Sequence, residues 1–149
     1  MEAIIFIGIQ ATGKSTFFLR RFFATHARIN LDMLKTRSRE RILLAACLEA
    51  RQPFVIDNTN LTREARAYYI SQAKAAGFEV TGYYFKSSLQ AALERNRRRG
   101  GKSLIPEKGI FSAYRKLEPP SFDEGFDQLF YVEIADDGQF IVKEWGDEV

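Results

Sequence analysis

The residues with the clearest chemical potential lie near the N-terminus, in the segment Gly8-Ile9-Gln10-Ala11-Thr12-Gly13-Lys14-Ser15. This segment matches the phosphate-binding pattern G-x-x-x-x-G-K-[ST] without a gap. Its glycines let the backbone curl so that successive N–H groups point at phosphate oxygens. Lys14 can reach the β- and γ-phosphates, and the Ser15 hydroxyl suits a Mg²⁺ ligand position. The motif therefore predicts a site for ATP and Mg²⁺ that includes Gly8, Thr12, Gly13, Lys14, Ser15 and Thr16.

A second candidate is Asp32, which follows a short apolar segment at an expected helix start. An aspartate at such a place can be an ordinary N-cap. It can also be a general base, because phosphoryl transfer to a hydroxyl needs a carboxylate near the γ-phosphate to accept the proton. One residue can do both, and we predict Asp32 as the base.

A third candidate is the polar tetrad Asp57-Asn58-Thr59-Asn60, which follows the apolar run Phe54-Val55-Ile56. In open α/β sheets, ligands bind at the carboxyl ends of the strands. The tetrad can also be a turn rich in Asx residues. Four consecutive polar residues exceed what a turn needs, which favours a site for substrate or for Mg²⁺-bound water.

Arginines are concentrated in Arg95-Asn96-Arg97-Arg98-Arg99, just before Gly100-Gly101. A flexible glycine pair beside several arginines is typical of a lid that closes over ATP and neutralises charge on the transferred phosphoryl group. These arginines span more than one helical turn, so they cannot all face one phosphate.

Elements that could position these residues follow from the alternation of apolar runs and helical stretches. This alternation predicts an α/β fold, a P-loop-type parallel sheet flanked by helices, in a single domain with a basic lid. The expected strands cover residues 3–8, 54–56, 78–85, 128–134 and 140–145. The expected helices cover residues 14–25, 32–51, 62–77, 88–98 and 107–117.

The net charge of +3 conceals an uneven distribution. Residues 117–149 hold ten acidic residues against Lys143 alone, a net charge of −9, which leaves +12 for residues 1–116. The basic part suits a polyanionic partner, either ATP or nucleic acid. No apolar run approaches the ~20 residues that span a bilayer, so no membrane role is expected. The single cysteine, Cys47, and the lack of a signal-like N-terminus predict a core thiol and a cytoplasmic location.

The clusters together resemble the kinase domain of the polynucleotide 5′-hydroxyl kinase family, which includes the kinase half of polynucleotide kinase-phosphatases. The resemblance covers the chain from Ile4 to about Ile134. The P-loop is shared by many families, and the D-N-T-N and Y-R-K…E-G-F elements are more specific. The matching segments are the P-loop, Asn30-x-Asp32, Asp57-Asn58-Thr59-Asn60, Arg95-Asn96-x-x-Arg99-Gly100, Ile105-Pro106, and Tyr114-Arg115-Lys116 with Glu124-Gly125-Phe126.

This resemblance implies transfer of the γ-phosphate of ATP to a 5′-OH end of DNA or RNA, with Asp32 as general base. It places Lys14 and Ser15 on ATP·Mg²⁺, and the lid residues Arg95 and Arg99 on the nucleotide phosphates.

On the acceptor side, the resemblance implies a pocket lined by Asp57, Asn58 and Asn60, with Arg66 on a substrate phosphate. Lys35 stands where some members carry an arginine near the acceptor phosphate, and a lysine there loses bidentate geometry. The sequence contains no D-x-D-G-T-type motif, so no phosphatase domain is expected in it.

Two other functions stay open. A kinase of a small hydroxyl compound (a nucleoside, sugar or antibiotic) would use the same parts. A nucleotide-dependent binding or regulatory module would need neither Asp32 nor the arginine lid. The positive charge of residues 1–116, together with Arg66, favours the polymeric acceptor.

Overall fold

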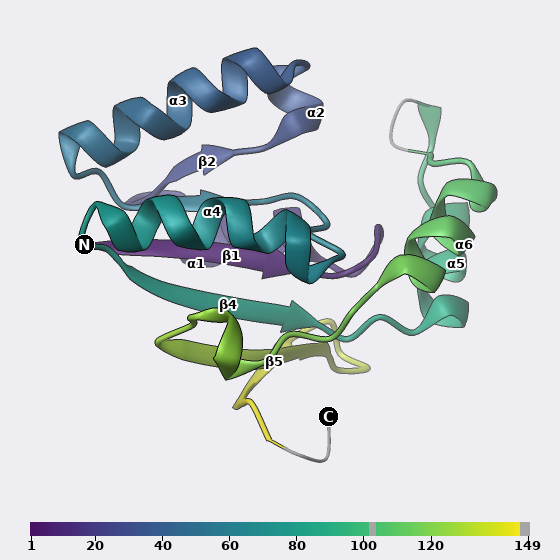
Figure 1. Ribbon diagram of the computed structural model, residues 1–149. Helices are drawn as coiled ribbons and strands as arrows, with labels where there is room; N and C mark the ends of the chain where they lie inside the picture. The colour runs from purple at the N-terminus through teal and green to yellow at the C-terminus, as the bar shows by residue number, and fades with distance from the viewer. Residues whose placement is uncertain (102–103, 147–149) are drawn as a thin grey trace.

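Six strands form one sheet in the order β2-β3-β1-β4-β5-β6 (Figure 1). The computed structural model describes residues 1–101 and 104–146. The first five strands in this order pair in parallel, and β6 pairs antiparallel to β5. The predicted α/β fold with a mostly parallel sheet is confirmed. The strands are β1 (Glu2–Ile7), β2 (Ala27–Ile29), β3 (Phe54–Ile56), β4 (Glu79–Phe85), β5 (Gln128–Ile134) and β6 (Phe140–Glu144).

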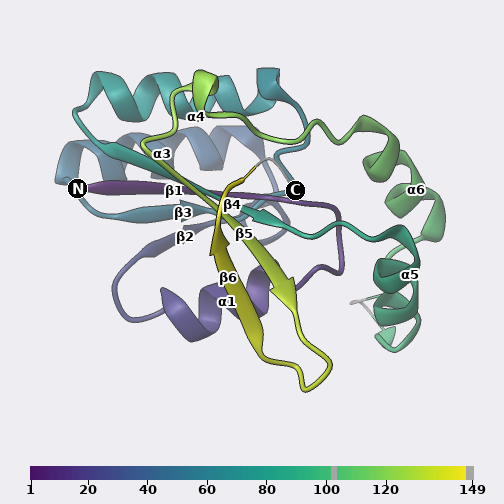
Figure 2. The same cartoon turned by 90° about the horizontal axis from the view of Figure 1, so that it is seen from below.

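Helices cover both faces of the sheet, and two more lie beyond its carboxyl edge. Helices α3 and α4 cover one face and α1 covers the other, whereas α5 and α6 stand apart beyond the ends of β1 and β4 (Figures 1 and 2). A short helix, α2, follows β2, and a 3-10 turn, η2, precedes β5. The helices are α1 (Lys14–Arg21), α2 (Leu31–Leu34), α3 (Arg37–Ala50), α4 (Arg63–Ala75), α5 (Leu89–Arg97), α6 (Glu107–Lys116) and η2 (Phe122–Glu124).

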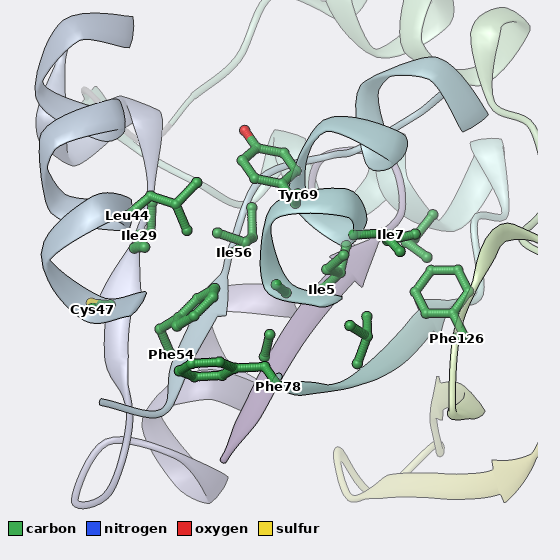
Figure 3. Packing of buried hydrophobic residues seen from close by; sticks show 14 of the residues in the cluster. Ile5, Ile7, Ile29, Leu44, Cys47, Phe54, Ile56, Tyr69, Phe78 and Phe126 are labelled. Atoms are coloured by element: carbon green, nitrogen blue, oxygen red, sulfur yellow. The ribbon is translucent and has the colours of Figure 1, made fainter. Parts of the chain in front are cut away.

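The alternation of side chains along β1 divides the core in two. Ile5 and Ile7 face α3 and α4 in a cluster that includes Cys47 (Figure 3), which confirms the predicted core position of this thiol. Ile4 and Phe6 point to the opposite side and pack against the phenylalanines of α1. Both faces of β1 are buried, which explains why its sequence is a continuous apolar run. The phosphate-binding motif follows directly after this buried strand.

Two sequence-predicted elements differ from the structure. The helix expected over 32–51 is divided into α2 and α3, because Lys35 adopts a φ of 76° and Thr36 starts α3 by accepting a hydrogen bond from Arg39 N–H. The helix expected over 14–25 ends at Arg21. Strand β2 was not predicted, since its three residues include Arg28 and do not form an apolar run like that of β3.

Within the described residues, every helix is too short or too polar to cross a bilayer.

Candidate active site

The loop between β1 and α1 has the backbone shape that phosphate binding requires. Gly13 has a φ of 93°, and a Cβ on it would lie 2.9 Å from Phe140 Cε1. Gly8 is equally enclosed, because a Cβ there would lie 3.1 Å from Phe85 Cβ. Both positions therefore require glycine, and the loop leads directly into the N-terminus of α1. The Thr12 hydroxyl donates to Ile9 O over 2.8 Å and braces the loop from inside.

Lys14 folds over the loop that it follows. Its ammonium donates to Gly8 O over 2.9 Å and to Ile9 O over 2.6 Å. Burial, together with the positive charge of Arg99, lowers the pKa of Lys14 to about 8, although the negative charges of Asp57 and Asp32 act in the opposite direction. A triphosphate would give this ammonium a better partner than backbone carbonyls.

The pKa of Lys14 predicts a proton linkage in ATP binding. ATP binds the charged ammonium, so affinity should fall as the pH rises through about 8, where half of the free protein must first take up a proton. Titration calorimetry at pH 8 in buffers of different ionisation enthalpy should show uptake of about half a proton per ATP. Lys14→Arg is the control, because a guanidinium does not titrate in this range. Equal uptake by both proteins would assign the proton to another group.

Asp57 lies at the P-loop, where a hydroxyl and a carboxylate meet. Its Oδ2 accepts from Ser15 Oγ over 3.4 Å and from Arg28 Nε over 2.8 Å. Asp57 is 2% exposed, and Arg28 also donates to Ser15 Oγ over 3.0 Å. A hydroxyl beside a buried carboxylate is a donor set that fits Mg²⁺, which prefers oxygen ligands. The position of Asp57 therefore favours a role beside Mg²⁺-bound water over the role in the acceptor pocket that the family resemblance implies.

Asp32 faces the same cavity as the P-loop. This cavity of about 340 Å³ is lined by residues from the loop, from α2 and from the end of β3, and it includes Lys14, Asp32 and Asp57. Asp32 is the second residue of α2, and Asn30 caps that helix by accepting from Met33 N–H over 2.9 Å. The cap is thus Asn30 rather than Asp32. The carboxylate of Asp32 is left on the cavity side, where its charge acts on Lys14.

Arg95, in α5, and Arg99, just after this helix, lie beside the phosphate-binding loop. Arg99 lines the cavity that holds Lys14 and Asp32. Arg95 donates to Ala11 O over 3.3 Å and, together with Arg99, lines a smaller cavity that is bordered by Thr16 and the β5–β6 hairpin. Asn96, 1% exposed, links α5 to the segment before α6 by donating to Ile105 O over 2.6 Å and accepting from Ile105 N–H over 2.8 Å.

A wider groove adjoins the cavity of the P-loop and Asp32 on the side of α3 and α4. It measures about 550 Å³ and shares Leu31, Asn58 and Thr59 with that cavity. Tyr68 and three basic side chains also line it. The basic side chains are those of Arg37, Arg41 and Lys116. An acceptor molecule lying in this groove would reach the cavity of Asp32 past the shared residues Leu31, Asn58 and Thr59.

Three predicted acceptor residues take other positions. Arg66 is fully buried and forms an ion pair with Glu124, with Nε 2.8 Å from Oε1. Its predicted contact with a substrate phosphate is therefore replaced by a structural role. Asn60 lines the groove, yet its amide donates to Phe6 O over 2.7 Å and ties the loop to β1. Lys35 is exposed just after α2, outside the residues that line either cavity.

Loss of the Arg66 guanidinium should destabilise the fold. Arg66→Met leaves the buried carboxylate of Glu124 without its main partner, which typically costs about 3–5 kcal/mol. Chemical denaturation would measure this loss. Arg63→Met is the matched control, because Arg63 lies on the same helix but pairs with Glu124 only at 3.8 Å and is 44% exposed. Comparable losses in both variants would contradict the assignment.

Two residues at the site, Arg28 and Glu40, belong to none of the sequence motifs. Arg28 lies in the unpredicted β2 and reaches both Ser15 and Asp57. Glu40 is buried in α3 beside the groove, and only its place in a helix was expected. These positions have no local sequence signal, because Arg28 meets Asp57 from 29 residues away, and Glu40 meets Asn58 and Tyr69 from 18 and 29 residues away.

A phosphate-binding loop, a carboxylate across the cavity and an arginine-bearing helix at the carboxyl edge of a parallel sheet define a P-loop kinase fold, the scaffold of a phosphotransferase. A family model described as an AAA domain matches residues 4–120, and the chain belongs to this family. It is also 29% identical over 129 residues to the bifunctional polynucleotide phosphatase/kinase of Schizosaccharomyces pombe, covering 84% of the chain. The chain spans about a third of the length of that curated relative, 32%.

Solved structures share the fold at low identity. A gluconokinase from Sinorhizobium meliloti 1021 superposes with a TM-score of 0.63 at 21% identity, covering 91% of this chain and 83% of that one. Chaetomium thermophilum Kti12 in complex with ADP-AlF3 has a TM-score of 0.64 at 19% identity, covering 91% and 90%. These likenesses show the fold, and they leave the acceptor open.

Proposed function

We propose that the protein is an ATP-dependent polynucleotide 5′-hydroxyl kinase. The observation that carries this proposal is the groove with basic side chains that opens into the cavity of Asp32. A chain of phosphodiesters has negative charge on both sides of the reacting nucleotide, so it suits cations spread along a groove better than a small acceptor does. The similarity to a polynucleotide phosphatase/kinase agrees with this acceptor.

In this proposal, Asp32 takes the proton of the 5′-hydroxyl as its oxygen attacks the γ-phosphorus. The bond between the γ-phosphorus and the β–γ bridging oxygen breaks, and ADP leaves with that electron pair. Lys14 and Arg99 would stabilise the charge on the phosphoryl oxygens, and Arg95 would hold the nucleotide from the lid side. Ser15, with Asp57 through water, would hold Mg²⁺, which shields the phosphate charges.

Residues that line the groove would bind the acceptor. Asn58 lies where groove and cavity meet, and Arg41 and Lys116 line the groove from α3 and α6 respectively. Tyr68, 39% exposed, offers an aromatic face that a nucleobase can stack on. Lys35 remains a proposed outer contact for an acceptor phosphate.

A kinase of a small hydroxyl compound is the second candidate, and the gluconokinase fold makes a sugar acid a useful competitor. The test is incubation of the protein with γ-labelled ATP and a panel of 5′-OH DNA and RNA oligonucleotides, nucleosides and gluconate. We expect label on the oligonucleotides, with an affinity that falls steeply between 50 and 200 mM salt, by roughly tenfold or more. Transfer to gluconate or a nucleoside alone would overturn the polynucleotide assignment and keep the kinase.

A further inference from the structure

Glu40 is a buried carboxylate that none of the sequence motifs includes. It lies on α3, is 3% exposed and lines the groove beside the catalytic cavity. Three donors converge on it, namely Tyr69 Oη at 2.9 Å, Arg37 Nη1 at 3.0 Å and Asn58 Nδ2 at 3.1 Å. A carboxylate buried at this depth is stable only with such partners.

The charge of Glu40 fixes the orientation of Asn58. A carboxylate accepts hydrogen bonds and cannot donate them, so Asn58 must present its NH₂ group to Glu40. The amide oxygen of Asn58 then points the other way, toward the backbone N–H of Leu31, from which it accepts over 2.9 Å. With a neutral partner at position 40, the two ends of the amide could exchange places.

This hydrogen bond acts on the residue next to Asp32. Leu31 is the first residue of α2, a helix of four residues. One helical turn has little stability of its own, so its position depends on side-chain contacts. The N–H groups of Leu31 and Met33, on either side of Asp32, are held by Asn58 and Asn30 respectively.

We propose that Glu40 is a positioning residue for phosphoryl transfer, which orients Asn58 and through the Leu31 N–H holds Asp32 at the reacting hydroxyl. This inference rests on the proposed role of Asp32 as general base, and it does not depend on which hydroxyl compound is the acceptor.

Glu40→Gln tests the proposal. The glutamine amide can donate to Asn58 Oδ1 and release Leu31, so kcat should fall roughly tenfold or more while the KM for ATP stays unchanged. Tyr69→Phe is the matched control, because it removes one donor to Glu40 and a long contact of 3.5 Å from Asn58 Nδ2, and it leaves the 3.1 Å bond between Glu40 and Asn58 in place. We expect its kcat to stay within about twofold of the parent.

A second readout does not depend on catalysis. Hydrogen exchange of the Leu31 amide, followed by NMR, should become faster in Glu40→Gln and remain as in the parent in Tyr69→Phe. Unchanged protection of this amide in Glu40→Gln would overturn the proposal. If Glu40→Gln does not fold, Asn58→Ala takes its place, since it removes the same bond to Leu31 and should lower kcat to a similar extent; a kcat equal to that of the parent would again overturn it.

A double-variant cycle separates positioning from direct contact with the acceptor. If Glu40 acts through Asn58, Glu40→Gln should have little further effect on kcat in the Asn58→Ala background. A rise in the acceptor KM in both backgrounds would instead make Glu40 an acceptor ligand and overturn the proposal.

The assays use whichever acceptor of the panel the parent protein phosphorylates, with Asp32→Asn run alongside. An inactive Asp32→Asn with a fully active Glu40→Gln overturns this inference alone. A fully active Asp32→Asn overturns the proposed base and the inference with it.

Discussion

Lys14→Ala is expected to abolish both ATP binding and phosphoryl transfer, with a fall in kcat/KM of at least ~10³-fold. The ammonium is the cation at the centre of the loop, and it now rests on Gly8 O and Ile9 O. Without it, the loop keeps its backbone donors but loses the charge that neutralises the β- and γ-phosphates. Equilibrium binding of a fluorescent ATP analogue and a steady-state transfer assay would measure the two losses.

Stability should respond in the opposite direction to activity in this variant. Burial of Lys14 lowers its pKa, which means that the charged ammonium is poorly solvated in the nucleotide-free protein. Lys14→Ala should therefore melt at the same temperature as the parent or higher. Lys86→Ala removes an exposed lysine just after β4 and should leave ATP binding unchanged. ATP binding by Lys14→Ala at parental affinity would refute the assignment of the loop.

Asp32→Asn should separate binding from chemistry. The amide keeps the shape of the side chain but cannot take the proton of the acceptor hydroxyl, so kcat should fall by roughly 10²–10⁴-fold. The Kd for ATP should change little, because in the proposed site the triphosphate would be bound by the loop and by Arg95 and Arg99 rather than by Asp32. Single-turnover transfer and ATP titration would measure the two quantities.

The matched control is Asp136→Asn, which removes a carboxylate from the exposed β5–β6 turn. Its turnover should equal that of the parent. If Asp32→Asn also turns over at the parental rate, the proton is accepted by another group, and the catalytic assignment of α2 is wrong.

The sequence by itself determined the parts of this protein that are contiguous in the chain. The phosphate-binding loop is read from eight adjacent residues, because its curled backbone needs glycine at fixed positions whatever surrounds it. The alternation of apolar strands and helices likewise predicted the α/β class, since the buried β1 and β3 have no polar face to confuse the pattern. The segments that hold Asp32 and Asp57 were also predicted, because each is a short run of adjacent residues in the sequence.

The tertiary structure decided which side chains become partners at the site and which become partners in the core. Arg66 looked like a phosphate ligand, but Glu124, 58 residues further along, takes its guanidinium into a buried ion pair. Asp57 accepts a hydrogen bond from Ser15, and Glu40 accepts one from Asn58. Such choices depend on distances between side chains that only folding brings together, and the free energy of burying a charge depends on that partner rather than on the local sequence.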